Sequence, residues 1–438
     1  MRLSLRTPVC SAILLITLFW GSVQTTAHAQ SFTRDTLTLR LPEIEKRFLD
    51  SNLLLLAAHF NVDAQQALVQ QARLWDNPVL NTDQVIAAGG RFFPYGKNAD
   101  GSFRGQYFAQ VQQLIKTAGK RNKLISLANT NVKISEWQLQ DILRNLRYQL
   151  RIDYFTILQQ LETGNIYASQ LAQLQKLLNG MQAQLNAGNI AQKDFLRIQN
   201  LVISLEQDLT ELNRSLADTE ADLKTLLGIK EAVFIKPGDR FAAKTDPEAA
   251  WLSDQGLLYE SARKNNPYYQ LQVTQTLYQQ QNLDYQKALR IPDITLGPNF
   301  DRNSNYTPNY VGLGISLPLP ILNKNQGNIR SAAFTVKQQQ SVTANAEAEL
   351  LNNITNAYTK LLLSVKQNSG SQPGFYEKYH AMYGNVVQSY QQKQISLLEF
   401  LDFFNDYTAS QQRLLQQQLT LQLAKEALNY QLGTDMIK

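Results

Sequence analysis

Hydrophobic and polar positions change their period in the same order in both halves of this 438-residue chain. Helical spacing over about residues 43–74 and 255–289 gives way to alternation with a period of two. The alternation is clear over 294–301 and 310–317, where apolar residues alternate with small or polar ones. It is weaker in the first half, over 79–86 and 106–112. This pattern predicts four strands with one apolar and one polar face.

Long stretches of helical spacing follow each pair of strands. We expect long helices over about 120–187 and 326–392, each followed by a shorter one over 191–227 or 397–432. A helix of more than 60 residues would be roughly 100 Å long, at about 1.5 Å rise per residue. The first shorter helix has apolar residues at alternating spacings of four and three, the seam of a coiled coil: Ile198, Val202, Leu205, Leu209, Leu212 and Leu216. The sequence therefore predicts an elongated helical bundle.

The chain is one unit written twice. Asn52 and Pro78 have counterparts in Asn266 and Pro292 at one constant displacement. The first copy has about ten extra residues, in the Gly-rich, polar stretch 89–103, which we expect to be an exposed loop.

We therefore divide the chain into two repeats. The first, 30–240, contains a helix, a hairpin at 78–114 and a long helix pair at 120–227. The second, 241–438, contains a helix, a hairpin at 292–318 and a long helix pair at 326–432.

The strands raise the question of what they pair with. Beyond the N-terminal region no run of 18 apolar residues exists, so only strands could enter a membrane. Four strands are too few to close a membrane barrel, because the smallest use about eight. They must pair with strands of other chains or cap a helical core.

Composition narrows the function further. Only 18% of residues are charged, the mean hydropathy is −0.31, and the formal charge is +6 without any run of Lys or Arg. This distribution lacks the basic patch of a nucleic-acid-binding protein.

Residues 1–29 have the features of a secretory signal peptide. Arg2 and Arg6 precede the apolar stretch 11–23, and Ala27 and Ala29 supply a cleavage site. A membrane anchor would need an apolar core of about 20 residues. Cleavage would remove the one cysteine, and with it any disulfide or thiolate chemistry.

The remaining chemistry does not indicate an enzyme. The mature chain has two histidines, His59 and His380, which we interpret as packed or surface helix residues. No GxSxG, P-loop, HExxH or CxxC motif is present, and four methionines supply no copper-type thioether cluster. We expect no cofactor and no bound metal.

Several segments resemble the TolC family of outer-membrane efflux channels, most closely its heavy-metal branch (cobalt-zinc-cadmium or copper/silver). The resemblance covers the mature chain and rests on five runs in a fixed order: QARLWDNPVL at 71–80, QLIKTAGKRNK at 113–123, LNAGNIAQKDFLRIQ at 185–199, LPLPILNKNQG at 317–327 and SYQQKQISLLEFLD at 389–402.

This resemblance implies a mostly helical chain with internal duplication. Three chains would each give four strands to a twelve-stranded barrel in the lipid of the outer membrane, continued by a helical coiled-coil tunnel through the periplasm. The homotrimer would dock on a periplasmic adaptor and an inner-membrane pump, and would act as a passive exit channel. The alternative is a periplasmic adaptor or coiled-coil scaffold without a barrel.

The family has its periplasmic gate at the helix–helix turns. Matching residue by residue, Glu399 and Asp402 occupy acidic positions at the narrow tip, and Asp194 has a similar place in the first repeat. Three chains would bring six carboxylates of the first pair together, which attract cations. Ser396 and Glu399 also form a capping-box sequence, and a capping or surface role suits Asp194.

Two features depart from the family pattern. Gly188 keeps the usual glycine of the tip turn, whereas Lys393 replaces it in the second repeat, which puts the conformation of that turn in doubt. The stretch 369–374 should break or kink the second long helix.

Overall fold

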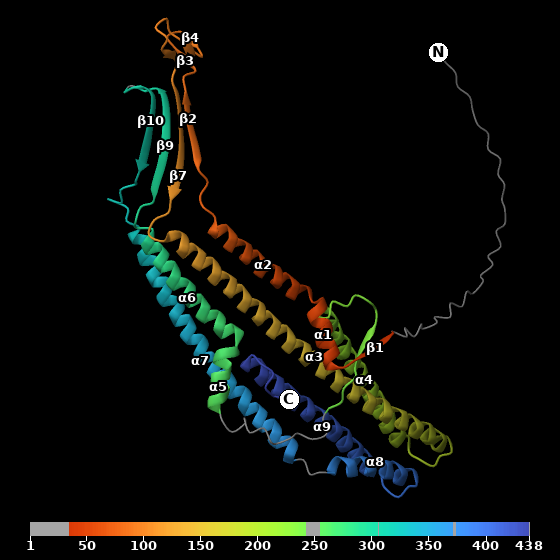
Figure 1. The fold of residues 1–438 in the computed structure, drawn as a ribbon. Coiled ribbons are helices and arrows are strands. Elements are labelled where there is room, and N and C mark those ends of the chain that lie inside the picture. The colour runs from red at the N-terminus through yellow and green to blue at the C-terminus, as the bar shows by residue number, and fades with distance from the viewer. Residues whose placement is uncertain (1–34, 242–254, 305, 371–373, 438) are drawn as a thin grey trace, which may run out of the picture.

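The computed structural model describes residues 35–241, 255–304, 306–370 and 374–437. The predicted signal peptide, residues 1–29, lies outside them. The molecule is elongated, with a sheet at one end and long helices running away from it (Figure 1). None of the helices in the described part of the chain is both long and apolar enough to cross a membrane.

The four expected strands form one antiparallel sheet. Its order is β10-β9-β7-β2, so β10 and β2 are its edges. The bounds are β2 (Val79–Gln84), β7 (Tyr107–Ile115), β9 (Ile294–Asn303) and β10 (Pro308–Ser316).

The two faces of this sheet differ as the alternation predicts. Phe300 of β9 lies between Ala109 of β7 and Val311 of β10, in a row of apolar residues. Leu313 and Ile315 continue this face and are exposed. The next row on the opposite face joins Gln110, Asn299 and Gly312. The opposite face is therefore polar.

The stretch 89–103 is exposed, as expected, but it is not an irregular loop. It takes part in two small hairpins, made by β3 (Ala87–Ala88), β4 (Arg91–Phe92), β5 (Gly96–Lys97) and β6 (Phe103–Arg104). Three positive-φ glycines, Gly89, Gly90 and Gly101, allow the tight turns.

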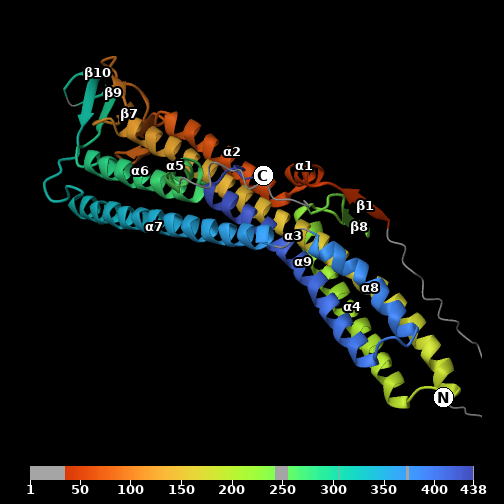
Figure 2. The same ribbon diagram turned by 90° about the horizontal axis from the view of Figure 1, so that it is seen from below.

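Nine helices are described in these residue ranges. Their bounds are α1 (Leu41–Ser51), α2 (Leu53–Arg73), α3 (Lys120–Asn186), α4 (Gln192–Leu226), α5 (Gln255–Asn265), α6 (Pro267–Ala288), α7 (Gln326–Gly370), α8 (Phe375–Gln391) and α9 (Leu397–Leu432). Near the sheet, α2, α3, α6 and α7 lie side by side in that order; beyond them α3 packs on α4 and α9, and α9 packs on α8 (Figures 1 and 2). The predicted seam residues Ile198, Val202 and Leu205 are buried.

The first helix of each repeat, expected to be continuous, is divided by an asparagine. The Asn52 side chain accepts a hydrogen bond from the Leu55 N–H (3.0 Å) and donates one to the Leu226 carbonyl (2.9 Å). Asn266 does the same with Tyr269 (3.1 Å) and Gln431 (2.9 Å). An asparagine that caps a helix interrupts it without disturbing the hydrophobic period, so periodicity alone did not show the break.

The expected break in the second long helix is present. Helix α7 ends at Gly370 and α8 begins at Phe375, after Gly374 in a left-handed conformation (φ +81°). By contrast, α3 continues through Gly164 over 67 residues.

Two short parallel strands near the middle of the molecule were not predicted. β1 (Thr36–Leu39) pairs with β8 (Phe234–Pro237). The Tyr154 hydroxyl of α3 donates to the Asp239 carboxylate (2.6 Å), which also accepts the Leu41 N–H (2.9 Å). These contacts attach both segments to the middle of α3.

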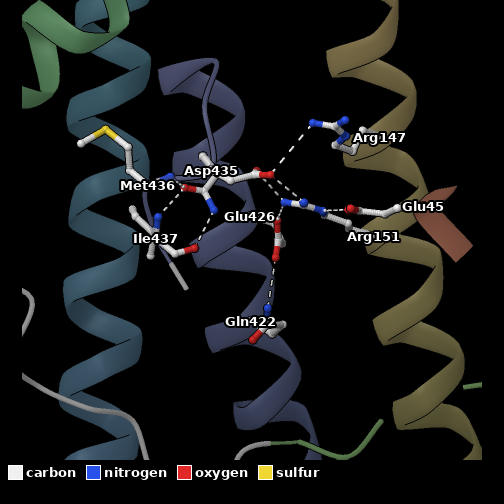
Figure 3. A network of polar contacts seen from close by, with 9 residues as sticks. Glu45, Arg147, Arg151, Gln422, Glu426, Asp435, Met436 and Ile437 are labelled. Carbon is white, nitrogen blue, oxygen red and sulfur yellow. Dashed lines mark hydrogen bonds and ion pairs between the residues drawn. The ribbon is translucent and has the colours of Figure 1, made fainter. Parts of the chain in front are cut away.

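A charged network around Arg151, one helical turn before Tyr154 on α3, joins the two repeats. The Arg151 guanidinium of α3 contacts Glu45 (2.6 Å), Glu426 (2.7 Å) and Asp435 (2.8 Å) (Figure 3). The Asn429 side chain forms hydrogen bonds with the backbone of Met436 and Ile437, which hold this C-terminal segment against α9. Arg151 therefore ties α1, α9 and the C-terminal segment to α3.

Candidate gate at the helix turns

The turn between α3 and α4 is a glycine-dependent helix end. Gly188 has φ +74°, and its N–H donates to the Leu185 carbonyl (2.9 Å). The Asn189 N–H donates to the Gln184 carbonyl (2.9 Å), which completes a Schellman motif. A Cβ on Gly188 would meet no atom within 4 Å, so the demand for glycine comes from the backbone alone.

The turn between α8 and α9 has the same conformation despite its lysine. Lys393 has φ +60°, and its N–H donates to the Tyr390 carbonyl (2.9 Å). The Gln394 N–H donates to the Ser389 carbonyl (2.8 Å). The doubt raised by Lys393 is thus resolved, because the hydrogen bonds of the helix end hold it in the left-handed region at a cost of roughly 1–2 kcal/mol.

Glu399 fills the capping position predicted from the sequence. The Ser396 side chain accepts the Glu399 N–H (3.2 Å), and the Glu399 carboxylate accepts the Ser396 N–H (2.7 Å). The hydrogen bond from the Ser396 backbone holds the pKa of Glu399 below its usual value. The carboxylate is therefore charged, exposed and fixed at the tip of α9.

Asp402 lies three residues after Glu399, hence on the same side of α9, and it is exposed. Asp194 is half-buried in the first turn of α4. Burial raises the pKa of Tyr390 in α8, and the negative charge of Asp194 raises it further. Asp194 therefore lies near the second turn as well as the first. Within the described ranges, none of these three carboxylates has an ion-pair partner.

An aromatic core holds the two helix pairs together behind the turns. Tyr390 stacks on Phe400 with ring centres 4.9 Å apart, and Tyr383 on Tyr407 at 4.3 Å. Phe400, Phe404 and Tyr407 are buried in one cluster with Met181 and Ile198 of the first repeat. The aromatic partners of Tyr407 on α8 were not predicted from the sequence. The spacing of Tyr379, Tyr383 and Tyr390 was the available signal.

The histidines do not form a site. His380 bonds to the Tyr407 hydroxyl at the edge of this cluster, and His59 is exposed on α2. No grouping of three His, Cys, Asp or Glu side chains able to hold a metal ion occurs in the part of the chain that the structure describes.

The geometry defines a class: an elongated chain of two fused repeats, with an open sheet at one end and paired helix turns at the other. Residues 46–229 and 258–434 match the outer membrane efflux protein family, and the chain belongs to that family. The match supports an outer-membrane efflux channel rather than a periplasmic adaptor or scaffold.

Individual relatives agree with this assignment. The chain is 22% identical over 317 residues to the cobalt-zinc-cadmium resistance protein CzcC of Cupriavidus metallidurans, which covers 72% of this chain and 71% of that protein. The fold is similar to that of CusC (TM-score 0.72, 17% identity, 90% and 92% of the two chains). It is also similar to the open state of the MtrE outer membrane channel of Neisseria gonorrhoeae (TM-score 0.67, 17% identity, 91% and 90%).

Proposed function

We propose that this protein is the passive outer-membrane exit channel of a tripartite efflux system, working as a homotrimer. The observation that carries the proposal is that one chain supplies a sheet with two unpaired edges. β2 and β10 have no outer neighbour among the described strands, and three copies would complete a twelve-stranded barrel. The helices beside these edges agree, because α2 and α7 both expose large apolar side chains, including Leu53, Phe60, Phe334 and Leu363.

The turns of α3–α4 and α8–α9 form the periplasmic gate in this proposal. Glu399 and Asp402 of three chains give six carboxylates around the axis, and Asp194 adds three beside them. Such a ring attracts cations and repels itself when it narrows. The turns would also meet the periplasmic adaptor, while the inner-membrane pump supplies the energy.

We infer that divalent metal cations are the cargo. The support is the likeness to CzcC, whose name states cobalt, zinc and cadmium resistance. We assign the choice among metals to the pump and adaptor. Growth of a host without its own outer-membrane channel, carrying this chain and its cognate pump, should improve on zinc, cadmium or cobalt; equal growth without the chain would refute the assignment.

The channel and its gate are tested together in planar bilayers. The detergent-extracted protein should be a trimer that conducts ions with a preference for cations. Glu399→Gln keeps the capping box, since glutamine can replace glutamate there, and removes the charge. This variant, combined with Asp402→Asn, should lower the cation-over-anion permeability ratio. Asp218→Asn, which neutralises an exposed carboxylate on the shaft of α4, is the control. An unchanged ratio in the tip variant would refute the gate, and a water-soluble monomer would refute the channel.

A further inference from the structure

Two cations share one aromatic ring at the end of the sheet farthest from the helices. The Arg302 guanidinium carbon lies 3.8 Å from the centre of the Phe103 ring, and the Lys97 ammonium lies 5.3 Å from it. Lys97 and Phe103 belong to β5 and β6, within the stretch that distinguishes the first repeat from the second. Arg302 comes from β9 of the second repeat. The extra residues thus carry two of the three members of a cluster that spans both repeats.

The register places this cluster on the apolar side of the sheet. Phe300 lies in the apolar row with Ala109 and Val311, and Arg302 follows two residues later on the same face. Tyr107 of β7 has the same parity as Ala109. An aromatic and cationic band therefore follows the exposed aliphatic residues of the strands. Such a band is typical of the level where a membrane-spanning strand reaches the lipid headgroups.

The nearest carboxylate in the sequence does not neutralise this cluster. Asp301 faces the polar side, where it accepts hydrogen bonds from the Gln106 side chain (3.2 Å) and the Asn303 N–H (3.1 Å). Asp100 is bonded to Ser102 in its own turn. Within the described residues, no carboxylate lies at ion-pairing distance from Arg302 or Lys97. Both cations therefore remain available to an anion from outside.

Assembly of three chains through the sheet edges would leave the cluster of Arg302, Lys97 and Phe103 exposed. β7 and β9 are the inner strands of the sheet, whereas the edges that a second copy would cover are β2 and β10. The cluster lies at the ends of β7 and β9 that are farthest from the helices, so it belongs to the outer surface of a trimer.

We propose that Arg302 and Lys97, held beside the Phe103 ring, bind the phosphate groups of the glycolipid in the outer leaflet of the membrane. This inference rests on the proposed function, because it takes the sheet to span the outer membrane with its helices in the periplasm. The aliphatic rows of the strands lie against the acyl chains, and the two cations meet phosphates at headgroup level. The ring keeps both cations in position, and the guanidinium supplies directed hydrogen bonds.

The test measures binding of lipid A to the purified full-length trimer by native mass spectrometry. Lys97→Gln combined with Arg302→Gln should weaken binding of lipid A with both phosphates roughly 30-fold, as expected for two cations near a headgroup. The matched control is Arg330→Gln with Lys337→Gln, because these cations flank Phe334 on α7 at 5.8 and 5.9 Å from its ring centre. The control should bind like the wild type.

A second measurement needs no variant. Wild-type binding of the phosphorylated lipid should weaken as salt rises, whereas binding of the dephosphorylated lipid should not. Equal binding of the two lipids, or equal binding by wild type and the Lys97/Arg302 variant, would overturn the inference. Conductance of the same preparation separates the two proposals: a conducting trimer without a phosphate preference refutes this site alone, and a preparation that forms no channel refutes the proposed function.

Discussion

Replacing Arg151 by methionine should leave one carboxylate buried without a cation. Of the three acids that Arg151 contacts, Asp435 and Glu45 have side chains 50% and 23% exposed, so water can solvate both. Glu426 is only 7% exposed. Burial already raises the pKa of Glu426, and the charge of Arg151 opposes that shift. Without the arginine, the pKa of Glu426 rises further.

The size of the effect has an upper limit set by protonation. Protonating a carboxylate with an ordinary pKa of 4.5 costs about 3.4 kcal/mol at pH 7, at 1.36 kcal/mol per pH unit. An unpaired Glu426 can always take up a proton, so its charge cannot destabilise the fold by more than this amount. We therefore expect Arg151→Met to lose about 3 kcal/mol of stability at pH 7, near the lower end for a broken buried ion pair. Because the folded-state pKa of Glu426 is raised, the loss grows as pH rises above 4.5 and disappears below it.

Thermal unfolding of the detergent-solubilised trimer at pH 5 and pH 8 measures this loss. Arg151→Met should be closer to the wild type at pH 5, and adding Glu426→Gln should recover much of the loss at pH 8. Arg214→Met is the control, because its ion pair with Glu211 is 73% and 74% exposed and contributes at most about 1 kcal/mol. An equal loss at both pH values, or a double variant no more stable than the single one, would refute the reasoning.

Three further predictions concern single residues. Gly188→Ala should destabilise its turn by about 1 kcal/mol and Lys393→Gly should stabilise its turn by a similar amount, since both positions have positive φ. Amide hydrogen exchange should therefore become faster in the first turn and slower in the second. A change of the same sign in both turns would contradict this. Asn52→Ala and Asn266→Ala should each cost about 1 kcal/mol or somewhat more in thermal unfolding, because each loses a helix cap and a link to the paired helix end; a clear inequality would contradict their equivalence. Burial raises the pKa of Asp153 to about 6, so its destabilising effect grows between about pH 4 and pH 6, and Asp153→Asn should flatten the stability profile there; an unchanged slope would contradict it.

The strands and long helices were predictable because the two sides of each element lie in different surroundings, and the side chains alternate accordingly. Alternation in 310–317 reflects a single exposed apolar face, and the four-three spacing after Ile198 reflects a narrow helix seam. Breaks at Asn52 and Asn266 were not predicted, because the apolar period continues across both. β1 and β8 were missed since each is only four residues long and pairs with a distant segment.

The candidate gate was predictable only where its contacts are local. The Ser396–Glu399 cap spans three residues and is visible in the sequence. By contrast, Asp194 lies near Tyr390 through packing between the two repeats. The same holds away from the gate, where Arg151 contacts Asp435, a residue 284 positions later in the sequence. Neither contact has a signal in composition or period.

The two repeats differ in how their long shafts are built, one from a single helix and the other from two. Helix α3 runs without interruption from the sheet to its turn, so a twist applied at the Gly188 end is carried along all 67 residues. The corresponding path in the second repeat is divided between α7 and α8. Two helices in series, instead of one, therefore connect the Lys393 turn to the strands. A rotation of the first repeat's turn thus passes along a single helix, whereas in the second repeat it has to pass from one helix to another.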